Sequence, residues 1–156
     1  MEVTLYTRQN CPLCDKAKDV LRGAGLTPKE VDVDLDLDLM RRLGNDVPVI
    51  YIDGVEAFRH RVTPEQLTSL MQRELSREWR VVDGHHLERE FRFKNFAEAL
   101  AFTNKVGAIA EEQGHHPDID LAWGRVRVKI WTHTVDGLTR SDFVLAAKID
   151  RMASSS

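Results

Sequence analysis

The chain has 156 residues, enough for one ordinary domain or two small ones. Its 42% hydrophobic and 30% charged residues exclude long disordered stretches, and its net charge of −3 excludes a global basic field for nucleic acid. No apolar run approaches the roughly 18 residues that span a bilayer, and the first residues lack a signal-peptide pattern. We therefore expect a cytoplasmic protein with neither nucleic acid nor membrane among its partners.

Cysteine, histidine and tryptophan are distributed unevenly along the chain. Both cysteines lie within the first 14 residues, whereas all three tryptophans and five of the six histidines follow position 75. A single mixed core would not need such a separation. We therefore predict two small domains, over residues 1–75 and 76–156.

The first of these predicted domains has the element order β-α-β-α-β-β followed by a helix. Its strands are expected at residues 2–7, 30–35, 47–52 and 55–58, and its helices at residues 13–22, 36–43 and 63–75. The last helix has a clear start, because Thr63, Pro64 and Gln66 have the spacing of a capping box with proline at the first helical position. We expect this helix to end the first domain and to be shared with the second.

Cys11-Pro12-Leu13-Cys14 follows the first predicted strand and opens the first helix. Two cysteines at this spacing form a reversible disulfide, and a helix N-terminus stabilises a thiolate. Cys11 is then the expected nucleophile and Cys14 the residue that resolves a mixed disulfide. Two other interpretations stay open, a pair of inert buried cysteines and half of a zinc site that would include His60.

This part of the sequence resembles the thioredoxin fold, and most closely the small glutaredoxin-like proteins. The similarity rests on three stretches: residues 5–7, residues 11–15, and Val47-Pro48 with the later Asp53-Gly54 turn. It implies an α/β thioredoxin-like domain in which Pro48 is cis and faces the cysteines. Residues 54–58 replace the paired glycines and acidic residues with which many glutaredoxins hold glutathione. The expected partner is therefore glutathione or another thiol.

The second predicted domain contains strands and two longer helices. Strands are expected at residues 80–82, 87–93 and 123–133, and helices at residues 96–113 and 139–152. Asn95 is the expected N-cap of the first helix, and Gly114 its end. In the last strand, Val126, Val128 and Ile130 share one face, whereas Trp131 and His133 lie on the other. His85 and His86 are expected in an exposed turn, and the terminal serines 154–156 are expected to fray.

The strongest motif of the chain lies in this second part. Its members are Glu111, His115, His116, Pro117, Trp123, Thr132, His133 and Asp142. Three imidazoles converge if the loop after the long helix faces the end of the last strand. Since neutral imidazole donates at one nitrogen and accepts at the other, such a group suits delivery of one proton and removal of another. A solvated His-His loop and a three-histidine zinc site are the other interpretations, and we expect no metal.

The spacing of these residues resembles that of the pterin-4a-carbinolamine dehydratases. The similarity covers about residues 77–152, with Ser141 standing where some members carry arginine before the aspartate. It implies an α+β domain with an antiparallel sheet packed on helices. It also implies a hydro-lyase that converts a 4a-hydroxytetrahydropterin into a quinonoid dihydropterin in tetrahydrobiopterin recycling.

The same resemblance implies roles for individual residues. His115 and His133 are the expected acid–base pair, and His116 binds substrate as a third catalytic-site imidazole. The other expected substrate contacts are Glu111, Pro117, Trp79, Trp123, Thr132 and Asp142. The resemblance further implies no tightly bound cofactor and a homodimer or homotetramer formed through the C-terminal domain. The alternative is a thiol-disulfide oxidoreductase whose C-terminal half serves as an oligomerisation or pterin-binding module.

Overall fold

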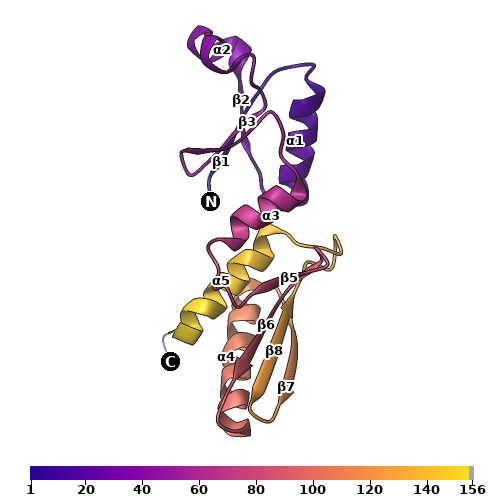
Figure 1. Ribbon diagram of the computed structural model, residues 1–156, viewed down its shortest axis with the longest axis vertical. Helices are drawn as coiled ribbons and strands as arrows, with labels where there is room; N and C mark the ends of the chain where they lie inside the picture. The colour runs from indigo at the N-terminus through magenta and orange to yellow at the C-terminus, as the bar shows by residue number, and fades with distance from the viewer. Residues whose placement is uncertain (155–156) are drawn as a thin grey trace. The chain divides into compact units, whose positions relative to one another are not determined.

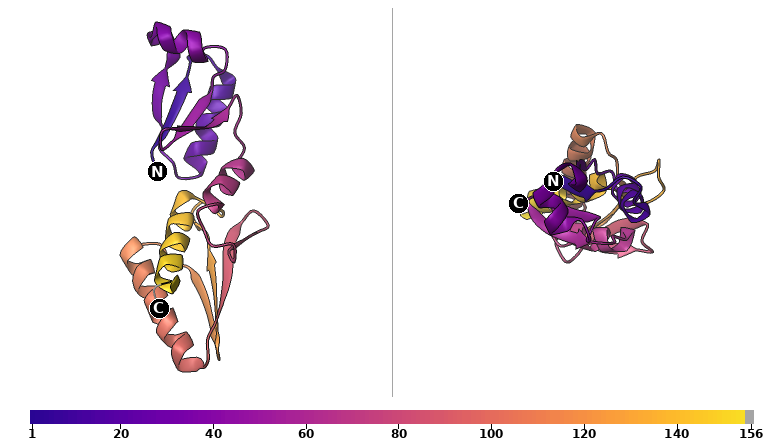
Figure 2. Two further views of the ribbon diagram at one scale, coloured as in Figure 1. Left: turned by 60° about the vertical axis from the view of Figure 1, so that its left-hand side comes forward. Right: turned by 90° about the horizontal axis from the view of Figure 1, so that it is seen from above.

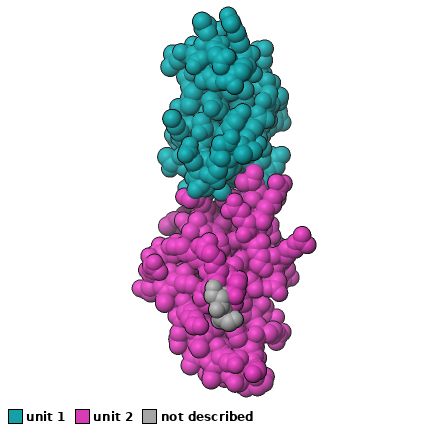
Figure 3. Space-filling view, turned by 90° about the vertical axis from the view of Figure 1, so that its left-hand side faces the viewer, with its two compact units in different colours: residues 1–67 teal, residues 68–156 magenta. Residues whose placement is uncertain are grey.

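The computed structural model describes residues 1–154, which divide into two compact units, residues 1–67 and the described residues from 68 onward (Figure 3). The boundary between the units falls inside helix α3 (Pro64–Gln72) rather than after it. Of the serines 154–156, which the sequence predicts to fray, residues 155 and 156 lie outside the described residues. Ser154 does not fray, because it is the last residue of a helix and its hydroxyl donates to the Asp150 carbonyl at 2.7 Å. Among the helices of residues 1–154, none is long and apolar enough to cross a membrane.

The first unit is built on a four-stranded sheet with the strand order β2-β1-β3-β4 (Figure 1). Strands β1 and β2 run parallel, whereas β3 is antiparallel to β1 and β4. The strands are β1 (Val3–Thr7), β2 (Lys29–Asp32), β3 (Val49–Ile52) and β4 (Val55–Arg59), and the helices are α1 (Pro12–Gly23), the 3₁₀ turn η1 (Val33–Leu35) and α2 (Leu37–Leu43). This order confirms the predicted sequence of elements.

Helix α1 packs on the sheet through a buried stripe of Cys14, Ala17 and Leu21, residues spaced three and four apart. The second strand is shorter than predicted. It ends at Asp32 because the side chain of Asp32 accepts the backbone N–H of Asp34 at 2.9 Å and starts the 3₁₀ turn. The alternation of apolar and acidic residues over 30–35 therefore covers the end of strand β2 and the whole 3₁₀ turn.

The predicted capping box before α3 is present in both directions. The Gln66 N–H donates to Thr63 Oγ1 at 3.1 Å, and the Thr63 N–H donates to Gln66 Oε1 at 3.0 Å. The helix ends at Gln72, three residues before the predicted end, and the chain then turns so that the Leu75 N–H bonds the Gln72 carbonyl.

The second unit consists of a four-stranded antiparallel sheet with two helices on one side of it (Figure 2). The strand order is β5-β6-β8-β7. The strands are β5 (Arg80–Val82), β6 (His86–Arg92), β7 (Asp118–Ala122) and β8 (Arg125–Ile130), and the helices are α4 (Phe96–Gln113) and α5 (Arg140–Ser154). Asn95 caps α4 by accepting the Glu98 N–H at 2.9 Å, as predicted.

The two faces of β8 have opposite characters, which confirms the predicted alternation. Val126, Val128 and Ile130 have no exposed surface and belong to the core. On the other face, Lys129 lies opposite Glu88 and Arg127 lies opposite Glu90 on β6. The basic side chains of this face are thus paired with acidic ones across the sheet.

The hairpin of β7 and β8 differs from the prediction, which placed one strand over residues 123–133. Strand β7 was not predicted, and β8 ends at Ile130 because Thr132 pairs with Gly137 across the following turn. Trp123 and Gly124 form the turn between β7 and β8. Gly124 has a φ of +68°, and a Cβ there would lie 2.9 Å from the Phe93 carbonyl oxygen, so only glycine fits.

Candidate active sites

The first candidate site begins where α4 ends. Gly114 adopts the left-handed conformation, with a φ of 63° and a ψ of 28°, and its N–H bonds the carbonyls of Ala110 and Glu111. The next residue, His115, donates its own N–H to Ala110 at 3.1 Å. This turn directs the His115 ring to the first turn of α5, where its Nε2 lies 2.5 Å from Asp142 Oδ1.

Asp142 has no exposed surface, and both oxygens of its carboxylate accept hydrogen bonds. Oδ2 accepts the Thr139 N–H at 2.8 Å and the Thr132 hydroxyl at 2.9 Å, while Oδ1 faces His115. The Thr139 contact has the form of one half of a capping box at the start of α5. Because an ionised carboxylate only accepts, Nε2 of His115 carries the hydrogen. The other ring nitrogen, Nδ1, has no hydrogen-bond partner within residues 1–154 and can exchange a proton with a substrate.

His116 lies at the surface beside the last turn of α4. Its Nε2 is 2.6 Å from Glu111 Oε1, and both side chains are more than half exposed. Pro117 follows and leads into β7. The structure thus pairs each imidazole of the His-His motif with a different carboxylate, one buried and one exposed.

His133 lies just past Thr132, whose hydroxyl bonds Asp142. In the described part of the chain, the His133 side chain makes no hydrogen bond, and its ring lies against Trp131 with centroids 4.6 Å apart. His115 and His133 are therefore linked through Asp142 and Thr132. Within residues 1–154, no group of histidine, cysteine and acidic side chains has the arrangement of a metal site.

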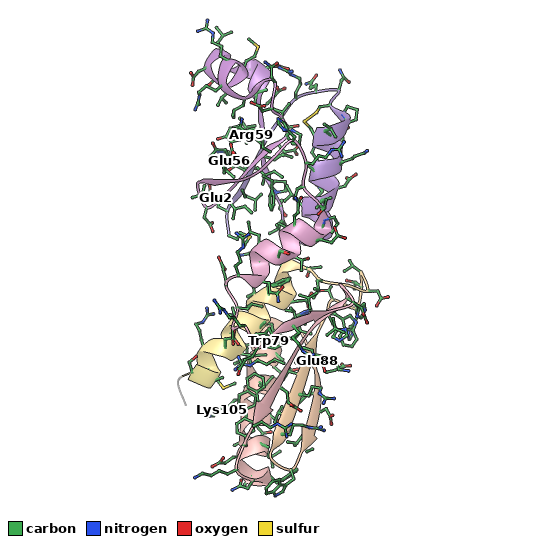
Figure 4. The ribbon with its side chains drawn as sticks, viewed as in Figure 1. Glu2, Glu56, Arg59, Trp79, Glu88 and Lys105 are labelled. Carbon is green, nitrogen blue, oxygen red and sulfur yellow. A yellow bond between two sulfur atoms is a disulfide. The ribbon has the colours of Figure 1, made fainter. Side chains whose placement is uncertain are left out.

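Two of the predicted substrate contacts, Trp79 and Trp123, make no hydrogen bond or ring contact with the three imidazoles within residues 1–154. Trp79 is only 1% exposed, and its indole Nε1 donates to Asp150 of α5 at 2.6 Å, so it belongs to the core (Figure 4). Trp123 is 72% exposed, but it lies in the turn at the far end of the β7–β8 hairpin. At about 3.3 Å per residue, β8 separates it from Thr132 by well over 20 Å.

His85 and His86 were predicted in an exposed turn; His85 does lie in the turn between β5 and β6, but His86 is the first residue of β6 and neither side chain is fully exposed. Both rings are half-buried against Trp131, with centroid distances of 5.4 Å and 6.0 Å. The signal lies in the strand register. Since Leu87 pairs with Ile130, His86 and Trp131 must be neighbours across the strands.

The second candidate site is the disulfide of Cys11 and Cys14 at the start of α1 (Figure 4). Cys11 is the N-cap of the helix, and its Sγ accepts the Cys14 N–H at 3.2 Å. Cys14 is buried, whereas Cys11 is partly exposed. The Val47-Pro48 peptide bond is cis, as the resemblance to the thioredoxin fold implied.

His60 is engaged elsewhere. Its Nε2 donates to Asp46 Oδ1 at 2.8 Å, and this hydrogen bond, with the charge of Arg59, holds the pKa of Asp46 below its usual value. This contact does not support the interpretation of His60 as a zinc ligand beside the cysteines.

A cavity of about 190 Å³ adjoins the disulfide loop through Leu13. It is lined on one side by Lys16 of α1 and on the other by residues 60–63, which follow β4. The Lys16 and Arg61 side chains have no anionic partner within the described residues. The cavity therefore places two unpaired positive side chains close to the loop that carries the disulfide.

The chain belongs to the pterin 4 alpha carbinolamine dehydratase family, which residues 60–152 match. Residues 2–72 match the glutaredoxin-like domain family. Both resemblances seen in the sequence are thereby confirmed, together with the predicted fold classes, an α/β thioredoxin-like domain and an α+β dehydratase-like domain.

Individual relatives match the C-terminal part. Two bear the name "putative pterin-4-alpha-carbinolamine dehydratase". The one from Alkaliphilus metalliredigens is 57% identical over 81 residues, which are 52% of this chain and 73% of the relative. The one from Rubrobacter xylanophilus is 64% identical over 74 residues, 47% of this chain and 69% of the relative. The crystal structure of a transcriptional coactivator/pterin dehydratase from Brucella melitensis is 34% identical with a TM-score of 0.53, covering 60% of this chain and 98% of that one.

Proposed function

We propose that the histidine site dehydrates a 4a-hydroxytetrahydropterin to a quinonoid dihydropterin. The observation that carries this proposal is the buried Asp142, which fixes His115 so that Nδ1 is open and connects through Thr132 to the segment of His133. A histidine oriented by a buried carboxylate is suited to general acid–base catalysis.

The reaction needs two proton transfers. The C4a hydroxyl leaves as water after it receives a proton, and the N5–H loses a proton as the double bond between N5 and C4a forms. His115 and His133 take these two transfers as an acid–base pair, one as the acid and the other as the base. His116, oriented by Glu111, binds the substrate beside them.

The test measures the dehydration rate of a 4a-hydroxytetrahydropterin with the wild type, His115→Ala, His133→Ala and the double variant. Each single variant is expected to lose about 10²–10⁴-fold in rate, the contribution of one positioned acid or base. His60→Ala, which changes the one histidine outside this unit, serves as the control and keeps the rate. Equal rates at the uncatalysed level for the wild type and the double variant would overturn the proposal.

The family also supports the wider setting that we propose. This comprises tetrahydrobiopterin recycling as the pathway, the cytoplasm as location and a homodimer or homotetramer formed through the C-terminal unit. If the protein instead binds a pterin tightly without turnover, the C-terminal half is a binding or oligomerisation module.

A second function, thiol-disulfide exchange, is favoured by the Cys11–Cys14 disulfide at the start of α1. In the reduced protein, the Cys11 thiolate attacks one sulfur of a partner disulfide and releases the other as a thiol. Cys14 then attacks Cys11, so that the internal disulfide forms and the second thiol leaves. The protein is oxidised by two electrons, and the partner is reduced by two.

The unpaired Lys16 and Arg61 beside Leu13 favour a thiol partner that carries carboxylates, such as glutathione or another anionic thiol. The test follows oxidation of the reduced protein by dithiodipropionate, which is anionic, and by cystamine, which is cationic. The anionic disulfide is expected to react several-fold faster. This preference should fall in Lys16→Gln/Arg61→Gln and remain in Lys29→Gln/Arg41→Gln, which loses the same charge.

Cysteine variants test the redox role itself. Cys11→Ser is expected to abolish exchange, and Cys14→Ser is expected to accumulate a mixed disulfide that is visible by mass spectrometry. If Cys11→Ser exchanges at the wild-type rate, the redox function is wrong.

A further inference from the structure

His133 differs from the other two imidazoles of the site in how it is held. His115 and His116 each have a ring nitrogen hydrogen-bonded to a carboxylate, at 2.5 Å and 2.6 Å. The His133 side chain is exposed and, within residues 1–154, has no hydrogen-bond partner. Its ring instead lies against Trp131, with centroids 4.6 Å apart and planes inclined by 49°. Both of its nitrogens are free, so its orientation depends on this aromatic contact.

Trp131 also contacts two rings from the neighbouring strand and its turn. The rings of His85 and His86, in and after the turn between β5 and β6, contact it at 5.4 Å and 6.0 Å. The register of β6 and β8 fixes this neighbourhood, because Leu87 pairs with Ile130. Trp131 therefore lies between His133 and a pair of half-buried imidazoles.

Hydrogen bonds connect the pair of His85 and His86 to the turn that carries His133. His85 Nε2 donates to Asp136 Oδ1 at 2.7 Å, and the Asp136 N–H donates to the His133 carbonyl at 3.2 Å. Because the carboxylate only accepts, Nε2 of His85 carries a hydrogen. In the neutral ring Nδ1 then accepts from Nδ1–H of His86, which is 3.1 Å away. Ring contacts thus lead from His133 to Trp131 and on to His85, and hydrogen bonds lead from His85 through Asp136 back to His133.

We infer that Trp131 is a positioning residue for His133, held in place by the hydrogen-bonded pair of His85 and Asp136. The inference rests on the proposed dehydratase function and deepens it. Trp131 fixes the ring of His133, the member of the acid–base pair that has no hydrogen bond of its own. A displacement of that ring by about 1 Å lowers the rate by up to about 10²-fold. Neither His85 nor Asp136 belongs to the motif from which the function was proposed.

Kinetics on the full chain test this role. Trp131→Ala is expected to lower kcat at least tenfold and to change KM less than threefold, because the residue acts through His133 and not on the substrate. Trp131→Phe keeps an aromatic face and is expected to restore kcat to within about threefold. His85→Ala is expected to give a smaller loss than Trp131→Ala. Phe96→Ala, which removes an exposed aromatic ring at the start of α4, is the control and keeps both constants.

A spectroscopic measurement tests the contact in the wild type, without any variant that must fold. The ring protons of His133 are expected to be shifted upfield by the Trp131 ring, whereas those of the exposed His116 are not. An unshifted His133 in the folded wild type would overturn the inference.

The failure of this inference is distinguishable from the failure of the proposed function. If His133→Ala is inactive while Trp131→Ala has the wild-type kcat, positioning by Trp131 is wrong and the dehydratase survives. If the wild type does not exceed the uncatalysed rate, the proposed function is wrong, and the shift of the His133 ring alone still reports the contact. A tenfold rise in KM at constant kcat in Trp131→Ala would also overturn the inference, since it would make Trp131 a substrate contact.

Discussion

Asp142 shows how one side chain serves both the fold and the chemistry of the histidine site. Its carboxylate caps the first turn of α5 through the Thr139 N–H, receives the Thr132 hydroxyl and orients His115. A buried acceptor with three donors is costly to disturb, because a donor left without a partner loses its interaction with water as well.

Asp142→Asn is predicted to lower the free energy of unfolding by about 1–3 kcal/mol. One oxygen becomes an NH₂ group, which donates and cannot accept, so either the His115 donor or the Thr139 and Thr132 donors lose their acceptor. Urea unfolding followed by circular dichroism measures the change. Asp136→Asn, at an exposed aspartate, should change stability much less, and equal effects of the two variants would contradict the prediction.

A second carboxylate, Asp46, gives a prediction about pH. The hydrogen bond from His60 and the charge of Arg59 lower its pKa in the folded state relative to about 3.9 in an unfolded chain. The ionised group therefore contributes to stability above pH 4, and this contribution is lost as the pH falls through the folded pKa. The difference in urea midpoint between wild type and Asp46→Asn should shrink between pH 6 and pH 3. A constant difference over that range would contradict this assignment.

At the scale of elements, the end of α4 decides where the His-His motif lies. Gly114 closes the helix in the left-handed conformation, and the chain then turns toward α5. The same helix contains Gly107 in its interior, and a Cβ would meet nothing within 4 Å at either glycine. The backbone conformation differs between them, since Gly107 is helical and Gly114 has a φ of +63°.

Substituting alanine at these two glycines is therefore predicted to have opposite effects. Gly114→Ala should cost about 1 kcal/mol because an L-residue is strained at positive φ. Gly107→Ala should stabilise the protein by about 0.5–1 kcal/mol, since alanine loses less backbone entropy in a helix. Thermal unfolding of both variants checks the signs, and a loss in both would show that a different interaction dominates.

Local signals in the sequence predicted those elements that local contacts determine. The caps at Asn95 and at Thr63 with Gln66 are hydrogen bonds between residues three apart, so the sequence alone contains them. Strand β7 was missed although its pairing with β8 is a local hairpin across Trp123 and Gly124. The alternation of acidic and apolar residues over 118–121 is the signal that could have found it. Strand parity placed Trp131 and His133 on one side, but it carried no information about which other strand lies beside them.

The candidate site was predictable for a similar reason and to a similar extent. Spacing identified His115, His116, His133 and Asp142 as members of one motif, and the structure joins His115 to Asp142. Spacing could not show that the Trp79 indole N–H donates to Asp150, or that Trp123 lies at the end of the β7–β8 hairpin opposite to Thr132. Those facts depend on contacts between residues 71 apart in the chain and on strand direction.

At the scale of the whole molecule, the candidate residues of each site come from one unit. The disulfide, Pro48 and the cavity at Leu13 belong to residues 1–67, and the three imidazoles with their carboxylates belong to residues 68–156. The two chemistries are therefore expected to be separable by mutation.

A cross-comparison tests this separation. Cys11→Ser/Cys14→Ser is predicted to keep pterin dehydration within twofold of the wild-type rate, and His115→Ala/His133→Ala is predicted to keep disulfide exchange within twofold. Both activities are measured on both full-length variants. A dehydration rate that changes severalfold in the cysteine variant, or between oxidising and reducing buffer, would show that the thiol state regulates the histidine site.

The overlap of the two family matches over residues 60–72 has a practical consequence for anyone who separates the halves. These residues contain the whole of α3 together with its Thr63 cap. A gene cut between codons 67 and 68 would leave one half with a capped but truncated helix and the other with a helix that has lost its start. Each half should therefore be cloned with its own copy of residues 60–72, and the same stretch should be left intact when either half is fused to another protein.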